Sequence, residues 1–360
     1  MRLGFKRSCG RIASLLGPKS YPIFAVPSGV SEAPIEKELL PSEPIDLPLP
    51  KTIEKELHSQ FLQRTGLLPP LGLFQLSNGI ATSLGGNLDQ KGRLIKTYLR
   101  PVDGKSAENH DLFNFSKRRF FPEIVESERV ISLTSGWQDM FYHWMYEVLP
   151  RLALVQNIEG KIYIDQGKSF QRESLLFFGV DPTRIIDASK FQGVRARELI
   201  VPAFPLIPTQ WACRFLKSHI PSKTTEKRRL YLSRKDADKR RVLNEIELVP
   251  ILQKYGFEVA TTSQLPFAEQ VKLFASAEIV VAPHGAGLSH LAFCKKGTPV
   301  LEMFAPSYTH TCYWQVAAAA ELSYHYLFGI DDGQSGDTDF EVDPKQFEKA
   351  LLHALADRQH

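Results

Sequence analysis

Cysteine is scarce in this chain of 360 residues, and the four that occur form no motif. Cys9, Cys213, Cys294 and Cys312 stand far apart, with no Cys-x-x-Cys pair among them. This spacing argues against a zinc site and against a redox-active pair. It fits reduced thiols best, so we expect a cytoplasmic protein.

Long apolar runs are also missing. No segment approaches the roughly 18 apolar residues that a membrane-spanning helix needs, and the run 12–16 is too short for a secretory signal. Residues 1–20 carry basic side chains and no acid. Contact of this segment with the inner face of an anionic membrane is one interpretation, and a simply basic chain start is the other.

A strong net charge is absent as well. The formal charge is +4, so bulk electrostatics do not indicate a nucleic-acid partner. The basic residues gather instead between 227 and 241, without the interleaved aromatic side chains of an RNA-binding platform. We interpret Arg228 and Lys239 as part of a solvated loop. Arg234 differs because it closes a predicted strand, and a guanidinium suits bidentate phosphate contact.

A strand followed by a glycine turn is the clearest feature that is present. The apolar run 279–282 stops at Pro283, and His284 and the turn Gly285-Ala286-Gly287 lead into a helix-like segment, 288–293. A glycine turn that opens a helix exposes N–H groups, and the helix start favours an anion such as a phosphate. A tight turn whose histidine satisfies a carbonyl is the alternative. The third glycine of a dinucleotide fingerprint is missing.

Strands and helices alternate through residues 229–328. Apolar runs predict strands at 229–234, 257–260, 278–282, 299–304 and 322–328, and helical patterns separate them. Such alternation predicts a parallel sheet with right-handed crossovers. Ligands of these sheets bind at the carboxyl ends of the strands. Since Arg234, His284 and Glu302 stand at or near such ends, we expect them to share one site.

Two segments together resemble the glycosyltransferase 61 family. "YLSRKDADKRRVLNE" and "VVAPHGAGLSHLAFCKKGTPVLEMF" resemble its C-terminal HGAGL turn and the acidic strand after it, and "GWQDMFYHWMYEVLPRLALV" is similar to its N-terminal signature. The resemblance implies an α/β, GT-B-like fold with two Rossmann-like domains whose parallel sheets face a cleft. It also implies inverting transfer of a sugar from a nucleotide-activated donor, with no cofactor and no required metal.

Three segments are expected along the chain. Residues 1–54, with seven prolines between positions 21 and 50, predict a basic start and an extended arm or linker. Residues 55–222 are assigned to an acceptor-side domain and residues 223–360 to a nucleotide-sugar-binding domain, since a chain of this length suits two domains. The expected partners are a nucleotide-sugar donor, with UDP favoured, and a saccharide or glycoconjugate acceptor, in bacterial surface polysaccharide synthesis.

A helix predicted over 139–156, interrupted near Pro150, carries the candidate base. Asp139, His143 and Glu147 follow at i, i+4 and i+8, which places them on one helical face. An inverting transfer needs a base for the proton of the acceptor hydroxyl. We assign His143, or failing that Glu147, and keep Asp139 as a weaker candidate because it also suits a helix cap. Packing of His143 in an aromatic cluster is the alternative.

Cationic side chains and the glycine turn are assigned to the donor diphosphate, whose charge grows as it leaves. The assigned residues are Arg234, Lys235, Arg240, His284, Gly285, Ala286 and Gly287. Glu302 is expected to accept hydrogen bonds from ribose hydroxyls, as acidic residues do in related nucleotide folds. Asp236 and Asp238 spell Asp-x-Asp, but we expect them to pair with Lys235 and Arg240 and predict no metal site.

Two other functions stay open. A similar two-domain scaffold suits other transfers to a saccharide, such as that of a pyruvyl group, and a non-catalytic nucleotide- or saccharide-binding protein is also compatible with the motifs. Hydride transfer is disfavoured because the full glycine fingerprint is missing. The sugar, the acceptor and the linkage depend on loops that vary without changing the fold.

Overall fold

The structure is a computed structural model that describes residues 30–33, 35–61, 65–96, 124–205, 207–220, 226–333 and 337–357. Its contacts divide the chain into two units, Met1–Pro41 with Pro70–Leu206 and Ser42–Pro69 with Ile207–His360. The membrane contact considered for residues 1–20 lies outside the described ranges. Within them, no helix combines the length and the apolar character needed to cross a membrane.

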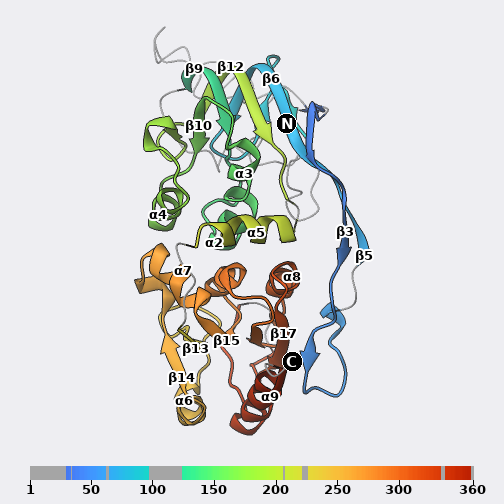
Figure 1. The fold of residues 1–360 in the computed structure, drawn as a ribbon, viewed down its shortest axis with the longest axis vertical. Coiled ribbons are helices and arrows are strands. Elements are labelled where there is room, and N and C mark those ends of the chain that lie inside the picture. The colour runs from blue at the N-terminus through green and yellow to red at the C-terminus, as the bar shows by residue number, and fades with distance from the viewer. Residues whose placement is uncertain are drawn as a thin grey trace, which may run out of the picture. The chain divides into compact units, whose positions relative to one another are not determined.

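The first unit is built on a mixed sheet of nine strands (Figure 1). Its strands are β1 (Val30–Ser31), β2 (Lys37–Leu40), β6 (Leu71–Thr82), β7 (Asn87–Leu88), β8 (Leu94–Ile95), β9 (Ile124–Ser132), β10 (Lys161–Ile164), β11 (Ile185–Asp187) and β12 (Gly193–Pro202). Strands β12, β9, β10 and β11 run parallel, whereas β6 pairs antiparallel with β12, β2 and β7. The α/β class is confirmed, but the predicted parallel sheet is wrong for this unit. Its β6–β7–β8 segment reverses through short turns, which only antiparallel strands permit.

The helix predicted over 139–156 forms in three pieces. They are α2 (Phe141–His143), a π-helical turn (Trp144–Val148) and α3 (Arg151–Val155). Leu149 N–H bonds to the carbonyl of Trp144 at 3.0 Å, five residues back, just before Pro150, which has no N–H to continue the ladder. Such π turns occur often at functional sites. The unit also contains α4 (Ser169–Phe177), which ends before Gly179 at φ 71°, and a short 3₁₀ turn (Pro182–Arg184).

The second unit contains the parallel sheet that the sequence predicts. Six strands follow the order β14-β13-β15-β16-β17-β4, and every pairing is parallel. They are β4 (Lys51–Thr52), β13 (Arg228–Leu232), β14 (Phe257–Ala260), β15 (Ala277–Pro283), β16 (Pro299–Phe304) and β17 (Ser323–Phe328). The carboxyl ends of β13, β15 and β16 therefore meet at one edge, and this edge carries the candidate donor site.

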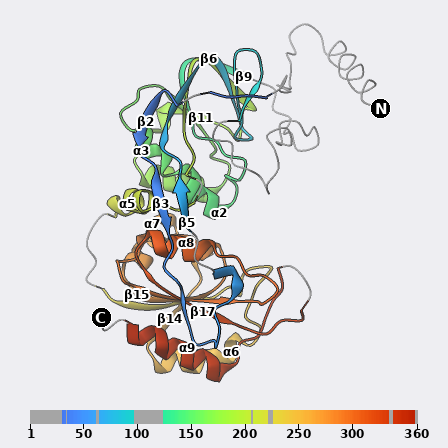
Figure 2. The ribbon, with the colours of Figure 1, turned by 90° about the vertical axis from the view of Figure 1, so that its right-hand side faces the viewer.

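Helices cover both faces of this sheet (Figure 2). Helices α6 (Glu245–Lys254) and α9 (Pro344–Ala356) lie on one side and α7 (Phe267–Ala275) and α8 (Cys312–Ala319) on the other. Leu248 and Leu252, one helical turn apart, are fully buried and join Phe347 and Leu351 of α9 in the core. The segment after the glycine turn is a 3₁₀ helix (Ala286–Phe293), and α5 (Gln210–Ser218) packs against it. A further 3₁₀ turn (Thr262–Gln264) precedes α7.

Residues 42–69 pack with the second unit, whereas the sequence divided them between an arm and the acceptor-side domain. Strand β3 (Glu43–Asp46) pairs with β5 (Thr65–Leu68), and a 3₁₀ turn (Ser59–Phe61) lies between them. Phe61 is fully buried, with its ring stacked on Tyr326 at 4.4 Å between centroids. Trp314 Nε1 donates to the carbonyl of Pro48 at 2.7 Å. These contacts anchor the proline-rich segment to the core of this unit.

One buried histidine of the second unit predicts how stability depends on pH. The ring of His290 stacks on Phe274 at 5.1 Å, and burial lowers its pKa to about 4. Its pKa in the unfolded chain is about 6.5, so the unfolded chain binds the extra proton between these values. The stabilisation present above pH 6.5 should thus be lost as the pH falls toward 4, on the order of 3 kcal/mol in all.

His290→Phe keeps a ring at this position and removes the titrating group. Urea unfolding between about pH 7.5 and pH 5 should show a smaller loss of stability in this variant than in the wild type. Equal pH dependence in wild type and His290→Phe would contradict the prediction.

Candidate functional site

Arg234 and Gly285 are in direct contact at the carboxyl edge of the second sheet. A Cβ atom at Gly285 would stand 1.9 Å from Nη1 of Arg234, so only a residue without a side chain fits beside this guanidinium. The φ of Gly285 is 176°, which is extended backbone that any residue adopts. Glycine is therefore needed here for space and not for conformation.

The guanidinium of Arg234 is incompletely paired. Its Nη2 donates to the carbonyl of Lys239 at 3.0 Å, and its Nε is buried without a hydrogen-bond partner in the described part of the chain. Burial, and then the nearby charge of Arg240, lower its pKa from the ordinary value. Two cations close together with few anions form a site that an anion would stabilise.

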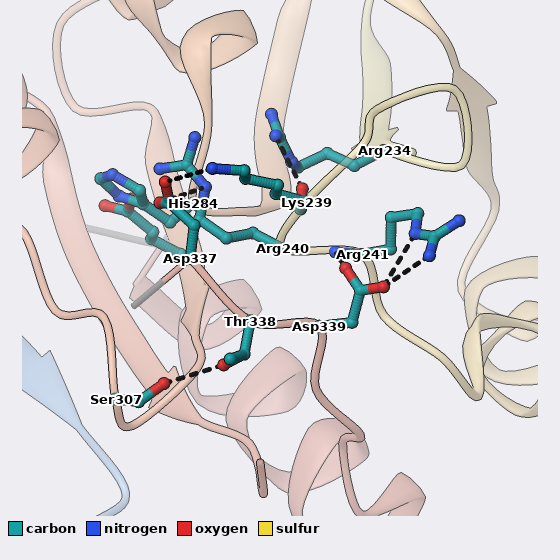
Figure 3. A network of polar contacts seen from close by, with 10 residues as sticks. Arg234, Lys239, Arg240, Arg241, His284, Ser307, Asp337, Thr338 and Asp339 are labelled. Atoms are coloured by element: carbon teal, nitrogen blue, oxygen red, sulfur yellow. Dashed lines mark hydrogen bonds and ion pairs between the residues drawn. The ribbon is translucent and has the colours of Figure 1, made fainter. Parts of the chain in front are cut away.

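Arg240 extends the same cationic surface (Figure 3). Its guanidinium lies over the ring of Tyr308 at 4.8 Å and pairs with Asp337 at 3.6 Å. Lys239 reaches the other oxygen of Asp337 at 3.2 Å. A single carboxylate is thus shared by two cations, while Arg234 next to them has no carboxylate partner among the described residues.

The imidazole of His284 is hydrogen-bonded to a buried carboxylate. Its Nδ1 lies 2.5 Å from Oε1 of Glu302, and the two side chains are 6% and 0% exposed. The second oxygen of Glu302 accepts a hydrogen bond from the hydroxyl of Tyr324. Burial raises the pKa of Tyr324 well above its ordinary value, so the hydroxyl keeps its proton and remains a donor. The ring of His284 also stacks on Phe304 at 5.3 Å between centroids.

The structure brings Arg234, Arg240, His284 and Gly285 together, as the sequence predicted, but not every assigned donor residue. Glu302 does lie beside His284, but it is fully buried, with its oxygens facing His284 and Tyr324, so it is not open to a ribose hydroxyl. The Lys235 side chain is exposed, and its backbone N–H bonds to Ser233 Oγ at 3.2 Å.

Ala286 and Gly287, the other two residues of the turn, are less tightly packed than Gly285. Ala286 is exposed, and a Cβ atom at Gly287 would meet Thr262 Oγ1 at 3.2 Å, a milder approach than at Gly285. These two residues can offer backbone N–H groups, whereas Gly285 makes room for Arg234.

The Asp-x-Asp segment pairs differently from the prediction. We expected Asp236 and Asp238 to pair with Lys235 and Arg240, but Asp236 accepts a hydrogen bond from Ser263, and Arg240 pairs with Asp337. The partner of Arg240 thus comes from a distant loop that no local pattern points to. Among the described residues, no group of three or more His, Cys, Asp or Glu side chains suits a metal ion.

In the first unit, His143 and Glu147 form a close pair. Nδ1 of His143 lies 2.7 Å from Oε1 of Glu147, with the side chains 12% and 6% exposed. The other oxygen of Glu147 accepts a hydrogen bond from Ser135 Oγ at 3.4 Å. The rings of Trp137 and Tyr142 flank the imidazole at 5.7 and 5.2 Å. His143 therefore has both features that the sequence offered as alternatives, an aromatic environment and a carboxylate partner.

Arg151 supplies a positive charge behind this pair. It is fully buried, lies over the ring of Phe204 at 3.9 Å, and donates to the carbonyls of Ser132 and Thr134 at 3.4 Å. Burial lowers its pKa to about 9, and the charge of Glu147 opposes this shift. Arg151 therefore remains charged at neutral pH.

Asp139 does not share the helical face of the pair. It is exposed in the turn before α2, whose N-terminal cap is Met140. The neighbouring Gln138, which the sequence did not single out, has a clearer role. Its Nε2 donates to Asp165 Oδ2 at 2.9 Å and its Oε1 accepts from the N–H of Ser135 at 3.0 Å, which fixes the turn beside Glu147.

Comparisons with known proteins match these two regions. The family model described as Glycosyltransferase 61 matches residues 141–301, which confirms the resemblance over that range. The EGF domain-specific O-linked N-acetylglucosamine transferase of Drosophila melanogaster is 29% identical over 133 residues, 32% of this chain and 25% of that protein. The chain thus spans about a quarter of the length of this relative.

Removing Arg151 should destabilise the protein because Glu147 would lose its buried counter-charge. We expect Arg151→Met to lower the free energy of unfolding by about 3–5 kcal/mol. The double variant Arg151→Met/Glu147→Gln should recover part of that loss, since neither charge is then left unpaired. Urea unfolding of the wild type, the two single variants and the double variant measures this coupling. Strict additivity of the two single effects would show that the charges do not interact.

Proposed function

We propose that the chain is a glycosyltransferase that moves a sugar, with inversion and without a metal ion, from a nucleotide-sugar donor to a saccharide or glycoconjugate. The convergence of Arg234, Arg240 and His284 beside Gly285 carries this proposal, because these groups suit a diphosphate. The family match over residues 141–301 supports sugar transfer as the general reaction.

The second unit is assigned to the donor. As the bond from the anomeric carbon to the phosphate oxygen breaks, its electron pair stays on that oxygen and the diphosphate gains negative charge. Fixed cationic donors stabilise that charge most where water is excluded. Arg234 meets this condition, since its guanidinium is partly buried and its Nε has no hydrogen-bond partner in the described chain.

The first unit is assigned to the acceptor. With Nδ1 of His143 bonded to Glu147, Nε2 is the nitrogen that takes the proton of the acceptor hydroxyl. The hydroxyl oxygen then forms the new bond to the anomeric carbon. Glu147, which is bonded to Nδ1 of His143, stabilises the imidazolium that results.

The acceptor class has two candidates. A saccharide acceptor, as in bacterial surface polysaccharide synthesis, is the first. A protein acceptor that receives N-acetylglucosamine is the second, and the name of the Drosophila relative favours it. Since the chain spans only a quarter of that relative, both acceptors belong in the test.

Purified protein should first be tested for the release of nucleoside diphosphate from a panel of UDP-sugars, with and without EDTA. Release of UDP from at least one donor, unchanged by EDTA, is the expected result. Transfer to oligosaccharides and to folded EGF-like domains then distinguishes the two acceptor classes. Activity with a pyruvyl donor and none with any nucleotide sugar would replace the proposal. Loss in EDTA with recovery in manganese would overturn its metal-independent part.

Arg234→Ala should weaken UDP binding by roughly 1.5–3 kcal/mol, as for a lost hydrogen bond to a charged group. Gly285→Ala should weaken it similarly, because its Cβ atom would displace the end of the flexible Arg234 side chain. Gly287→Ala is the matched control with a smaller expected effect. Isothermal titration calorimetry provides the dissociation constants. Unchanged UDP affinity in folded Arg234→Ala protein would exclude Arg234 from the donor site.

His143→Ala should lose about 10²- to 10⁴-fold in turnover, as for removal of a positioned base, while UDP affinity stays near that of the wild type. Glu147→Gln should cost less if Glu147 only orients His143, and as much if Glu147 is itself the base. Initial rates at saturating donor separate these roles. Turnover within a few-fold of the wild type in both variants would place the base elsewhere, with Asp139 the next residue to test.

A further inference from the structure

We infer that Glu302 is a positioning residue that acts through His284, and that Tyr324 fixes Glu302 in turn. In this arrangement His284 presents Nε2 to the diphosphate, and Glu302 never touches the donor. The inference rests on the proposed donor site of the second unit. It also replaces the expectation that Glu302 binds ribose.

The position of Glu302 in the sheet is the first argument. It lies within β16, which is hydrogen-bonded to β15 on one side and to β17 on the other. In register it stands beside Ala282 and Tyr326. The residue is fully buried. A carboxylate at this depth reaches a ligand only through another side chain.

The hydrogen bonds of Glu302 are the second argument. One oxygen faces Nδ1 of His284 at 2.5 Å and the other accepts from the hydroxyl of Tyr324. A buried carboxylate without such donors is strongly unfavourable. Glu302 therefore keeps a proton on Nδ1 of His284. The hydrogen bond at Nδ1 leaves Nε2 as the ring nitrogen that faces a ligand.

The immobility of the imidazole is the third argument. The backbone N–H of His284 donates to the carbonyl of Met303 at 2.8 Å, and the ring lies between Phe304 and Tyr313, with centroids at 5.3 and 5.1 Å. Rotation of the ring would break the bond to Glu302. Nε2 is thus the ring nitrogen left for a phosphate oxygen, on the same turn that packs against Arg234.

Two probes separate positioning from direct contact. UDP carries a ribose and a diphosphate, whereas inorganic pyrophosphate carries no ribose. If Glu302 acts through His284, Glu302→Gln should weaken both probes by about tenfold, the loss of one charge-assisted hydrogen bond. If Glu302 contacts ribose, only UDP binding should weaken. Tyr324→Phe, which keeps the ring and removes one donor, should weaken both probes by a smaller factor.

A double-variant cycle tests whether the effect passes through His284. Glu302→Gln added to His284→Gln should weaken pyrophosphate no further than His284→Gln alone. Asp357→Asn is the matched control, because Asp357 pairs with Nε2 of the buried His325 at 2.9 Å elsewhere in the same unit. This variant should bind both probes as the wild type does.

A measurement without ligand completes the test. The Nδ1 proton of His284, bonded to a carboxylate, should give a strongly downfield NMR signal that is absent in His284→Gln and moves upfield in Glu302→Gln. Absence of that signal from the wild type, or full additivity in the cycle, overturns the inference. Failure of the proposed donor site would give a different result. The affinities for UDP and pyrophosphate would then be unchanged in Arg234→Ala and His284→Gln, while the wild type still shows the Nδ1 signal of His284.

Discussion

A carboxylate inside a parallel sheet is tolerated only when hydrogen-bond donors satisfy both of its oxygens, and Glu302 meets this condition through His284 and Tyr324. The arrangement links three neighbouring strands, since Glu302 belongs to β16, His284 follows β15 and Tyr324 belongs to β17. Phe304 packs beneath the imidazole, and Phe61 packs against Phe304 and Tyr324 at 6.0 and 6.1 Å. The orientation of the histidine at the sheet edge therefore depends on the packing of the core, to which Phe61 from the segment 42–69 contributes.

The first unit also contains a histidine whose Nδ1 faces a carboxylate, but different groups surround that carboxylate. His143 also places Nδ1 on a carboxylate, but Glu147 is backed by the buried cation Arg151 and by a serine hydroxyl. Behind His284, by contrast, the carboxylate partner Glu302 is bonded to a tyrosine hydroxyl. The two histidine–carboxylate pairs therefore differ in the group that stands beside the carboxylate. In the proposed reaction His143 gains a proton, and a cation behind its carboxylate partner is consistent with that proposal.

Local patterns predicted five strands of the parallel sheet in the second unit because each of these is an apolar run bounded by a turn or a helix. The sixth strand, β4 (Lys51–Thr52), was missed because it is two polar residues. The local patterns also pointed to Arg234, His284 and the Gly285 turn, since polar residues after such strands meet at one edge. They could not reveal Tyr324, whose role depends on the register of β17 with β16. Asp337 was missed because its partners lie about a hundred positions earlier in the chain. The mixed sheet of the first unit was missed because its reversing segment, β6–β8, carries no helix to mark the topology.

The basic segment 227–241 shows that the sequence alone does not tell which basic side chains pair with carboxylates and which stay available to a ligand. Arg241 is paired with Asp339, which accepts from its backbone N–H at 2.8 Å and from two guanidinium nitrogens at 2.6 and 2.9 Å. Lys239 and Arg240 share the single carboxylate of Asp337, and Arg234 has no carboxylate within ion-pair distance in the described chain. The positive charge therefore remains least compensated where Gly285 lets the guanidinium approach the turn. A diphosphate at that point would supply the missing anion, and it would compete with Asp337 for Arg240.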